Sequence, residues 1–187
     1  MSVSMSILAI LDEGPAHGFQ LKNEFESRTG SIWSLNVGQV YTTLARHERD
    51  GYVRQRPNGG EKIYEITPAG RARLRDWFEE PTRQRTPSRD GLVLKLVMAV
   101  GRRGVKATDV IQAERKAAVQ ELQDCTRLKR TAEADDDLGW MFLLDSLIFH
   151  LEARVRWLDA CEARLRRAAK PAKAARSSAA EEAEVRR

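Results

Sequence analysis

The clearest signals of secondary structure lie in residues 37–70, VGQVYTTLARHERDGYVRQRPNGGEKIYEITPAG. The apolar spacing of this stretch predicts a helix over 37–50. Two short strands are expected over 52–56 and 61–66, on either side of a turn at 57–60. This turn contains Asn-Gly, a dipeptide that is typical of β-hairpins. The stretch therefore predicts one helix followed by a two-stranded hairpin.

Signals for further helices lie on both sides of this stretch. Asn36 is expected to cap the helix over 37–50, because its side-chain oxygen can accept a hydrogen bond from an unpaired amide. Thr67-Pro68 begins another helix, with Thr as the cap and Pro at a position where its missing N–H is harmless. Upstream, residues 3–12 and 17–28 predict two short helices. Three short helices followed by a hairpin is the order of a winged helix-turn-helix.

The second half of the chain predicts longer helices. After a loop over 81–91, helices are expected over 92–100, 108–131 and 138–168, and an acidic turn joins the last two. In the last helix, apolar side chains repeat about every 3.5 residues, which is typical of a coiled-coil seam. We expect this seam to pack against a second copy of the chain. The seam consists of Leu144, Ile148, Leu151, Val155, Leu158 and Leu165.

The helix over 37–50 is predicted to have an apolar face and a basic face. At about 100° per residue, the side towards the core holds Val37, Val40, Leu44 and His47. The opposite side is small near the helix start and basic towards its end. Such a face suits the major groove of DNA, where Gln39 can pair with adenine and Arg46 with guanine.

Positive charge collects around this helix and the hairpin. Residues 30–75 hold eight basic and four acidic side chains, a net charge of +4, whereas residues 1–29 sum to −2. A basic hairpin beside a basic helix can straddle a DNA groove and its backbone. The alternative is that these charges form an ordinary solvated surface of a small α+β domain. The predicted DNA-binding residues are Asn36, Gly38, Gln39, Tyr41, Thr42, Arg46, Arg49, Arg54, Arg56, Asn58 and Lys62.

The chain resembles the PadR family of bacterial transcriptional regulators. The N-terminal stretches that carry the resemblance are ILAILDEGPAHGFQL (7–21), VGQVYTTLARHERDGYV (37–53) and KIYEITPAGRARL (62–74). Within them, the Gly-Pro-x-His-Gly-aromatic element at 14–19 is the most diagnostic. The C-terminal half resembles the helical domain of the longer family members, of the virulence-activator alpha C-terminal type. RDGLVLKLVMA (89–99) and LEARVRWLDACEARL (151–165) carry this second resemblance.

The resemblance implies a dimeric winged-helix repressor. Such a protein would bind a palindromic operator, and a small aromatic or amphipathic ligand would modulate its DNA affinity. By analogy, Gln39, Tyr41, Thr42 and Arg46 belong to the recognition helix, and Arg54 to Lys62 form the wing. His47 stands where the family usually has leucine. It is interpreted either as a half-buried histidine with one hydrogen bond or as a pH-sensitive contact under the helix.

The sequence thus predicts a mainly α fold with two parts. These are an N-terminal winged helix-turn-helix domain and a C-terminal long antiparallel helical hairpin that forms a dimerisation domain. The DNA-binding domain is expected over 1–82 and the dimerisation and effector domain over 83–169. Residues 170–187, rich in Ala, Ser and charge, are expected to be a disordered tail.

Aromatic side chains concentrate in or near the helical half of the chain. Packing in the core and at an interface is one interpretation. The other, suggested by the family resemblance, is an effector pocket lined with aromatic rings. The candidate effector-binding residues are Trp77, Trp140, Phe149 and Trp157.

Several classes of protein are excluded by composition and spacing. Two cysteines exclude a disulfide scaffold and a four-cysteine zinc site. No residues have the spacing of a metal site, a phosphate loop or a nucleophile constellation. No apolar run reaches the ~18 residues of a membrane span, and no secretory leader is visible. We therefore expect a cytoplasmic, non-enzymatic protein without a metal or cofactor. Its expected partners are double-stranded DNA, a second copy and the effector; the alternative is a helical dimeric protein-interaction module without DNA binding.

Overall fold

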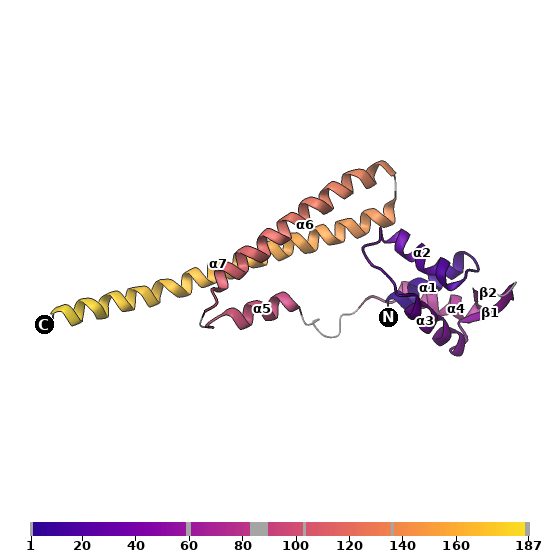
Figure 1. Ribbon diagram of the computed structural model, residues 1–187, viewed down its shortest axis with the longest axis horizontal. Helices are drawn as coiled ribbons and strands as arrows, with labels where there is room; N and C mark the ends of the chain where they lie inside the picture. The colour runs from indigo at the N-terminus through magenta and orange to yellow at the C-terminus, as the bar shows by residue number, and fades with distance from the viewer. Residues whose placement is uncertain (1, 59–60, 83–89, 103, 136, 186–187) are drawn as a thin grey trace. The chain divides into compact units, whose positions relative to one another are not determined.

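The chain divides into two compact units, Met1–Arg85 and Thr86–Arg187 (Figure 1). The computed structural model describes residues 2–58, 61–82, 90–102, 104–135 and 137–185, with no description of side chains at 2, 57–58, 61, 133–135 and 169–185. The predicted domain boundary between residues 82 and 83 adjoins residues 83–89, which lie outside the described residues.

The first unit has the predicted order of three helices, a hairpin and a further helix. Its elements are α1 (Ser2–Glu13), α2 (Gly18–Arg28), α3 (Val37–Arg49), β1 (Val53–Asn58), β2 (Glu61–Ile66) and α4 (Pro68–Glu79). Both predicted caps are confirmed. The side-chain oxygen of Asn36 accepts a hydrogen bond from the Gly38 amide at 2.7 Å, and that of Thr67 accepts one from the Gly70 amide at 3.1 Å. Strand β1 continues past its predicted end at Arg56 to Asn58, which pairs with Glu61.

The hairpin is tied to the loop between α1 and α2. The Ala16 amide donates to the Tyr64 carbonyl at 3.1 Å, and the Tyr64 amide donates to the Ala16 carbonyl at 2.9 Å. The sequence did not predict this bridge. It adds a third backbone partner beside the two antiparallel strands and fixes the hairpin next to the start of α2.

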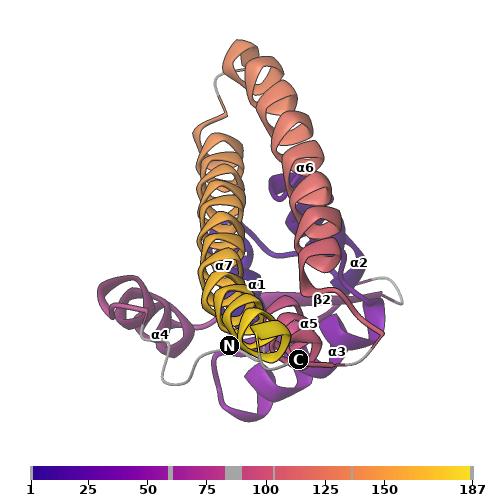
Figure 2. The same cartoon turned by 90° about the vertical axis from the view of Figure 1, so that its left-hand side faces the viewer.

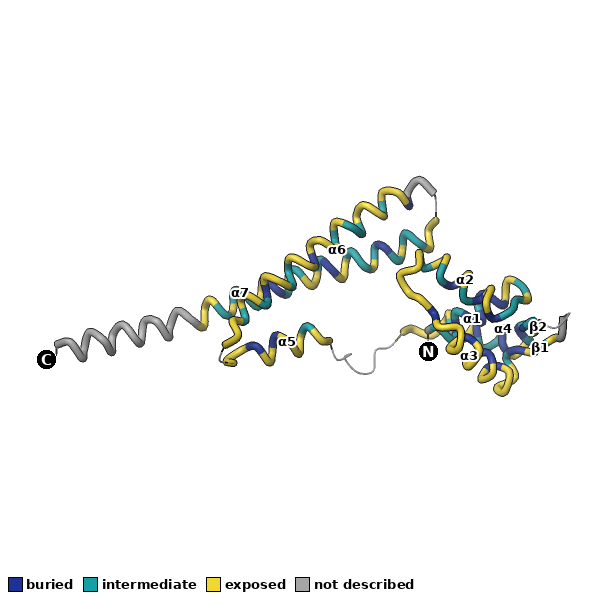
Figure 3. Tube along the Cα trace, viewed as in Figure 1, coloured by how far each residue is buried: buried dark blue, intermediate teal, exposed yellow. Residues whose placement is uncertain are grey.

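The helices of the first unit enclose one hydrophobic core (Figure 3). Val37, which was predicted to face this core, is exposed instead, because α3 enters the core only from Val40 onwards. Helix α4 approaches the backbone ahead of β1 so closely that a Cβ at Gly70 would lie 2.2 Å from the Tyr52 carbonyl oxygen. The largest fully buried side chains are Ile7, Leu8, Leu11, Leu21, Val40 and Leu44.

The second unit consists of α5 (Gly91–Ala99), α6 (Ala107–Asp135) and α7 (Leu138–Val185). Helices α6 and α7 form the predicted antiparallel hairpin, lying side by side in Figures 1 and 2. Helix α7 continues to Val185, past the end near residue 168 that the sequence predicts. The disordered tail over 170–187 stays a prediction. Low apolar content suggested disorder, but alanine, glutamate, lysine and arginine are also good helix formers.

Part of the predicted dimer seam is used within the chain. Leu144, Leu151 and Leu158 are buried without any partner chain, along the contact between α6 and α7. Ion pairs across this contact keep the two helices in register: Lys129 with Asp145 at 2.5 Å, and Arg115 with Glu162 at 2.6 Å. Glu162 lies between Leu158 and Leu165, where the apolar repeat would place another apolar side chain. In the structure, its carboxylate pairs with Arg115 instead. The other three seam residues, Ile148, Val155 and Leu165, are half-buried.

Candidate nucleic-acid interface

Helix α3 has the two faces that the sequence predicted. Val40, Leu44 and His47 are buried beneath it. The opposite face, which is exposed, carries Gly38, Gln39, Tyr41, Thr42, Arg46 and Arg49. The helix is therefore anchored in the core by its buried face, and its exposed face is free to contact a partner.

The exposed polar groups of α3 differ in whether the chain already engages them. Thr42 donates its hydroxyl hydrogen bond to the Gly38 carbonyl at 2.8 Å, and the Arg49 Nε donates to Asp50 at 3.0 Å. Within the described part of the chain, the side chains of Gln39 and Arg46 have no such partner. Both line a hollow of about 550 Å³ at the start of α3, next to α1. These two side chains are therefore available to contact a ligand.

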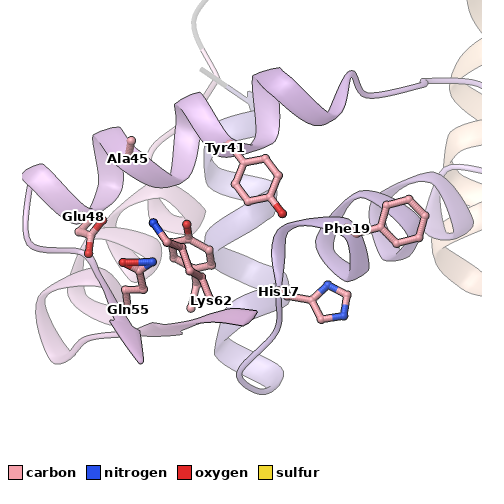
Figure 4. Close-up of a pocket in the computed structure, with 8 residues that line it drawn as sticks. His17, Phe19, Tyr41, Ala45, Glu48, Gln55 and Lys62 are labelled. Carbon is pink, nitrogen blue, oxygen red and sulfur yellow. The ribbon is translucent and has the colours of Figure 1, made fainter. Parts of the chain in front are cut away.

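Tyr41 owes its position to a glycine at the start of α2. A Cβ on Gly18 would lie 2.7 Å from Cζ of the Tyr41 ring, so only glycine lets the ring lie there. Figure 4 shows the Tyr41 hydroxyl pointing towards the beginning of α2. Sequence reasoning singled out the Gly-Pro-x-His-Gly-aromatic element but did not connect it with Tyr41. The structure shows that this element shapes the surface beside α3.

His17, from the same element, is the cap of α2. Its Nδ1 accepts a hydrogen bond from the Gln20 amide at 3.2 Å, while the Gln20 side chain accepts one from the His17 amide at 3.1 Å. This reciprocal arrangement is a capping box, with histidine in the place of the usual serine or threonine. The role of His17 is structural: it fixes the start of α2 beneath Tyr41.

A hollow of about 790 Å³ lies between α3, the hairpin and the start of α2. Figure 4 shows the side chains that line it, which come from these three elements. Lys62 brings a positive charge to it, and Glu48 brings a negative one. The hollow is lined by His17, Phe19, Tyr41, Ala45, Glu48, Gln55, Lys62 and Tyr64.

The arginines of the hairpin are paired with a carboxylate that sequence reasoning missed. Arg54 Nη2 lies 2.6 Å from Glu65 Oε1, and Arg56 Nε lies 2.7 Å from Glu65 Oε2. The hydrogen bond from Arg54 is the main reason why the pKa of Glu65 lies below its ordinary value. The strand register places Arg54 opposite Glu65, which is the signal that would have revealed the pair. The side chain of Asn58, also predicted to bind DNA, lies outside the described residues.

His47 is buried under α3, with 4% of its surface exposed. Its Nε2 lies 2.9 Å from the Ser4 carbonyl oxygen and 3.0 Å from the Ser4 hydroxyl, so a neutral ring with hydrogen on Nε2 donates to α1. Burial lowers the pKa of His47, in spite of the favourable contact with Ser4 and the charge of Asp50. His47 thus joins the recognition-helix candidate to α1 and carries no charge at neutral pH.

The four aromatic residues predicted to bind an effector are divided between the two units, with Trp77 in the first and the other three in the second. Trp77 packs against the core of the first unit, its ring 4.9 Å from that of Phe78. On α7, Trp140 is half-buried and Phe149 is exposed. Trp157 lines an apolar hollow of about 330 Å³ formed by α5, α6 and α7, with Arg164 at its margin.

The described residues show neither a metal site nor a membrane-spanning helix. They contain no group of three or more histidine, cysteine, aspartate or glutamate side chains placed to hold a metal ion. None of the helices within those ranges combines the length and apolar character that a membrane span requires. Asp137, from the acidic turn, accepts a hydrogen bond from the Trp140 amide at 3.0 Å and so caps α7.

Sequence comparisons identify two families along the chain. Residues 7–76 match the Transcriptional regulator PadR-like family, and residues 88–166 match the family described as Virulence activator alpha C-term. A probable transcriptional regulator of Mycobacterium tuberculosis is 27% identical over 179 residues, which cover 85% of this chain and 95% of the relative. The negative transcriptional regulator PadR of Bacillus subtilis is 23% identical, over 82% of this chain and 92% of its own length.

Solved structures share the fold. Bacillus subtilis PadR in complex with operator DNA superimposes with a TM-score of 0.68 at 22% identity, covering 87% of this chain and 97% of that one. The same protein in complex with p-coumaric acid gives 0.72 at 21% identity, over 89% and 99%. The Vibrio cholerae virulence activator AphA gives 0.66 at 22% identity, over 88% and 98%. The winged-helix architecture with C-terminal helices is therefore common to all of them.

Proposed function

Since the chain belongs to the PadR-like family of transcriptional regulators, which are not enzymes, we propose that it represses transcription by binding a palindromic DNA operator as a homodimer. The observation that carries this proposal is the exposed face of α3. Gln39 and Arg46 project from a helix that Val40 and Leu44 anchor in the core. A rigid helix with unengaged amide and guanidinium groups is suited to reading base edges.

In the proposed complex, α3 enters the major groove. Gln39 pairs with adenine and Arg46 with guanine, and each such pair contributes roughly 1–3 kcal/mol of discrimination against the wrong base. Tyr41 and Lys62, beside the hollow between α3 and the hairpin, face the flanking phosphates. Phosphate contacts set the register, whereas the α3 contacts select the sequence.

A dimer places two copies of α3 about 34 Å apart, one turn of DNA. Because half of the predicted seam is buried within the chain, we assign the contact to other side chains of α7. Phe142 and Phe149 are exposed and lie seven residues apart, so they share a face. At about 100° per residue, this face is opposite to the one that Leu144 and Leu151 bury. Leu138 continues the exposed stripe, which needs a covering surface.

The dimer contact is tested by substituting an exposed residue and a buried one. Phe149→Glu is expected to give a folded monomer in sedimentation experiments, because its ring is 67% exposed within the chain. Phe78→Glu, on an equally exposed ring of α4, is the matched control and should stay dimeric. Leu151→Glu should instead disrupt the α6–α7 hairpin itself. A dimeric Phe149→Glu protein would refute this surface.

We also propose that a small aromatic or amphipathic molecule modulates DNA binding. The p-coumaric acid complex of Bacillus subtilis PadR supports a ligand of this class. The apolar hollow beside Trp157, with Arg164 at its margin, has suitable chemistry for an aromatic carboxylate. Ligand and DNA would compete if they favour different dimer geometries. The Bacillus subtilis relative is named a negative transcriptional regulator, which supports repression. We place this function in the bacterial cytoplasm.

The experiment that tests the proposal is a titration of the full chain with its own upstream DNA at two salt concentrations. Wild-type binding should weaken steeply as salt rises, since phosphate contacts release counterions. Arg46→Ala should lose about tenfold or more in affinity. Arg154→Ala, an exposed arginine on α7, is the control and should bind like wild type. If no genomic fragment binds, the alternative of a protein-interaction module takes its place.

A further inference from the structure

Glu65 holds two arginines of the proposed DNA-binding surface at once. Arg54 and Arg56 stand two residues apart on β1 and so point to the same face of the hairpin. One oxygen of the Glu65 carboxylate lies 2.6 Å from Arg54, and the other lies 2.7 Å from Arg56. The carboxylate is only 20% exposed, whereas the two arginine side chains are 56% and 61% exposed. The guanidinium groups therefore reach the surface, but each already has a counterion.

We infer that Glu65 competes with DNA phosphates for Arg54 and Arg56 and thereby limits the sequence-independent part of DNA affinity. This inference rests on the proposed function. A phosphate that binds the Arg54 Nη2 or Arg56 Nε donor has to displace the carboxylate from it. Glu65 remains ionised at neutral pH, because Arg54 and Arg56 lower the pKa of its carboxyl group.

The fold has other means of holding the hairpin. The strands are registered by backbone pairs from Val53 with Ile66 to Asn58 with Glu61, and Ala16 pairs with Tyr64. Ion pairs with an exposed partner contribute little to stability. A carboxylate between two arginines is thus not required for the hairpin. The larger consequence of this carboxylate is electrostatic, because it engages arginines on a surface that would otherwise attract any phosphate.

The test is Glu65→Gln in the full chain, titrated with a random-sequence duplex between 50 and 200 mM salt. Each arginine released to a phosphate makes the slope of log affinity against log salt more negative by about 0.9. Two per protomer enlarge the change in affinity over this range by about tenfold per protomer. Glu114→Gln is the matched control, because it neutralises a carboxylate that pairs with Lys95 in the other unit. It should leave the slope unchanged.

A double arginine variant that retains Glu65 keeps the inference testable if Glu65→Gln does not fold. With Glu65 present, Arg54→Gln/Arg56→Gln should leave the salt slope close to wild type, because these arginines are engaged by the carboxylate. In the Glu65→Gln background, the same double substitution should restore the wild-type slope. An unchanged salt slope in Glu65→Gln overturns the inference but leaves the proposed function intact. A salt slope clearly flatter than wild type in the double arginine variant does the same. Failure of the wild-type protein to bind DNA at 50 mM salt overturns the proposed function, and the inference with it.

Discussion

Helix α3 and the β1–β2 hairpin are both rich in arginine, yet the fold treats their charges differently. In the described part of the chain, Arg46 on α3 has no counterion, whereas Arg54 and Arg56 on the hairpin share Glu65. Among the arginines of the two regions, Arg46 alone lacks a counterion within the described residues, because Arg49 pairs with Asp50. A basic segment attracts an anionic partner to the extent that the fold leaves its cations unpaired.

The largest expected effect comes from removing the anchor of α3. Leu44 is fully buried, so Leu44→Ala should lower the free energy of unfolding of the first unit by about 2–5 kcal/mol. Val37→Ala on the same helix is the control, because Val37 is exposed and its truncation should matter by no more than about 0.5 kcal/mol. Urea unfolding measures both. Equal losses would show that α3 is not held by one face.

A smaller effect should follow from filling the space that Tyr41 occupies. Gly18→Ala forces the ring away from the start of α2 and should weaken DNA binding by about 1.5–3 kcal/mol, the contribution of a hydrogen bond to a charged phosphate. Gly14→Ala is the matched control, because nothing lies within 4 Å of a Cβ built there. If both variants bind DNA like wild type, Tyr41 has no part in the interface.

The third effect concerns the histidine that joins α3 to α1. Because burial lowers the pKa of His47, the unfolded chain binds more protons than the folded one as pH falls below 6.5. Its contribution to stability is present above that pH and is lost as pH falls towards the folded-state pKa. The loss in the free energy of unfolding is about 1.4 kcal/mol for each pH unit by which the folded-state pKa lies below 6.5. His47→Leu should flatten the decline in melting temperature between pH 7 and 5, whereas His150→Leu should not. An equally steep decline in His47→Leu would contradict this assignment.

The sequence predicted the first unit well where one local signal determined the outcome. Asn36 and Thr67 are caps because a short polar side chain can satisfy amides nearby. The pairing of Glu65 with two arginines was missed because it depends on strand register, which joins residues about ten positions apart. The Ala16–Tyr64 bridge depends on a longer loop still, and no periodicity marks it.

The second unit shows a different limit of sequence reasoning. The repeat through Leu144, Leu151 and Leu158 predicted a seam, and the structure buries these residues. Periodicity identifies an apolar face but not the surface that covers it, which here is α6 of the same chain. In the same way, low apolar content in 170–187 does not distinguish a flexible tail from a helix rich in alanine.

The roles of α3 and the hairpin can be separated by the ratio of operator affinity to random-duplex affinity in two variants, Arg46→Ala and Arg56→Ala. If α3 reads the sequence while the hairpin arginines are held by Glu65, Arg46→Ala should reduce this ratio about tenfold or more. Arg56→Ala should leave it close to the wild-type value. A ratio that falls in Arg56→Ala and stays unchanged in Arg46→Ala would contradict the account, because sequence would then be read by the hairpin and not by α3.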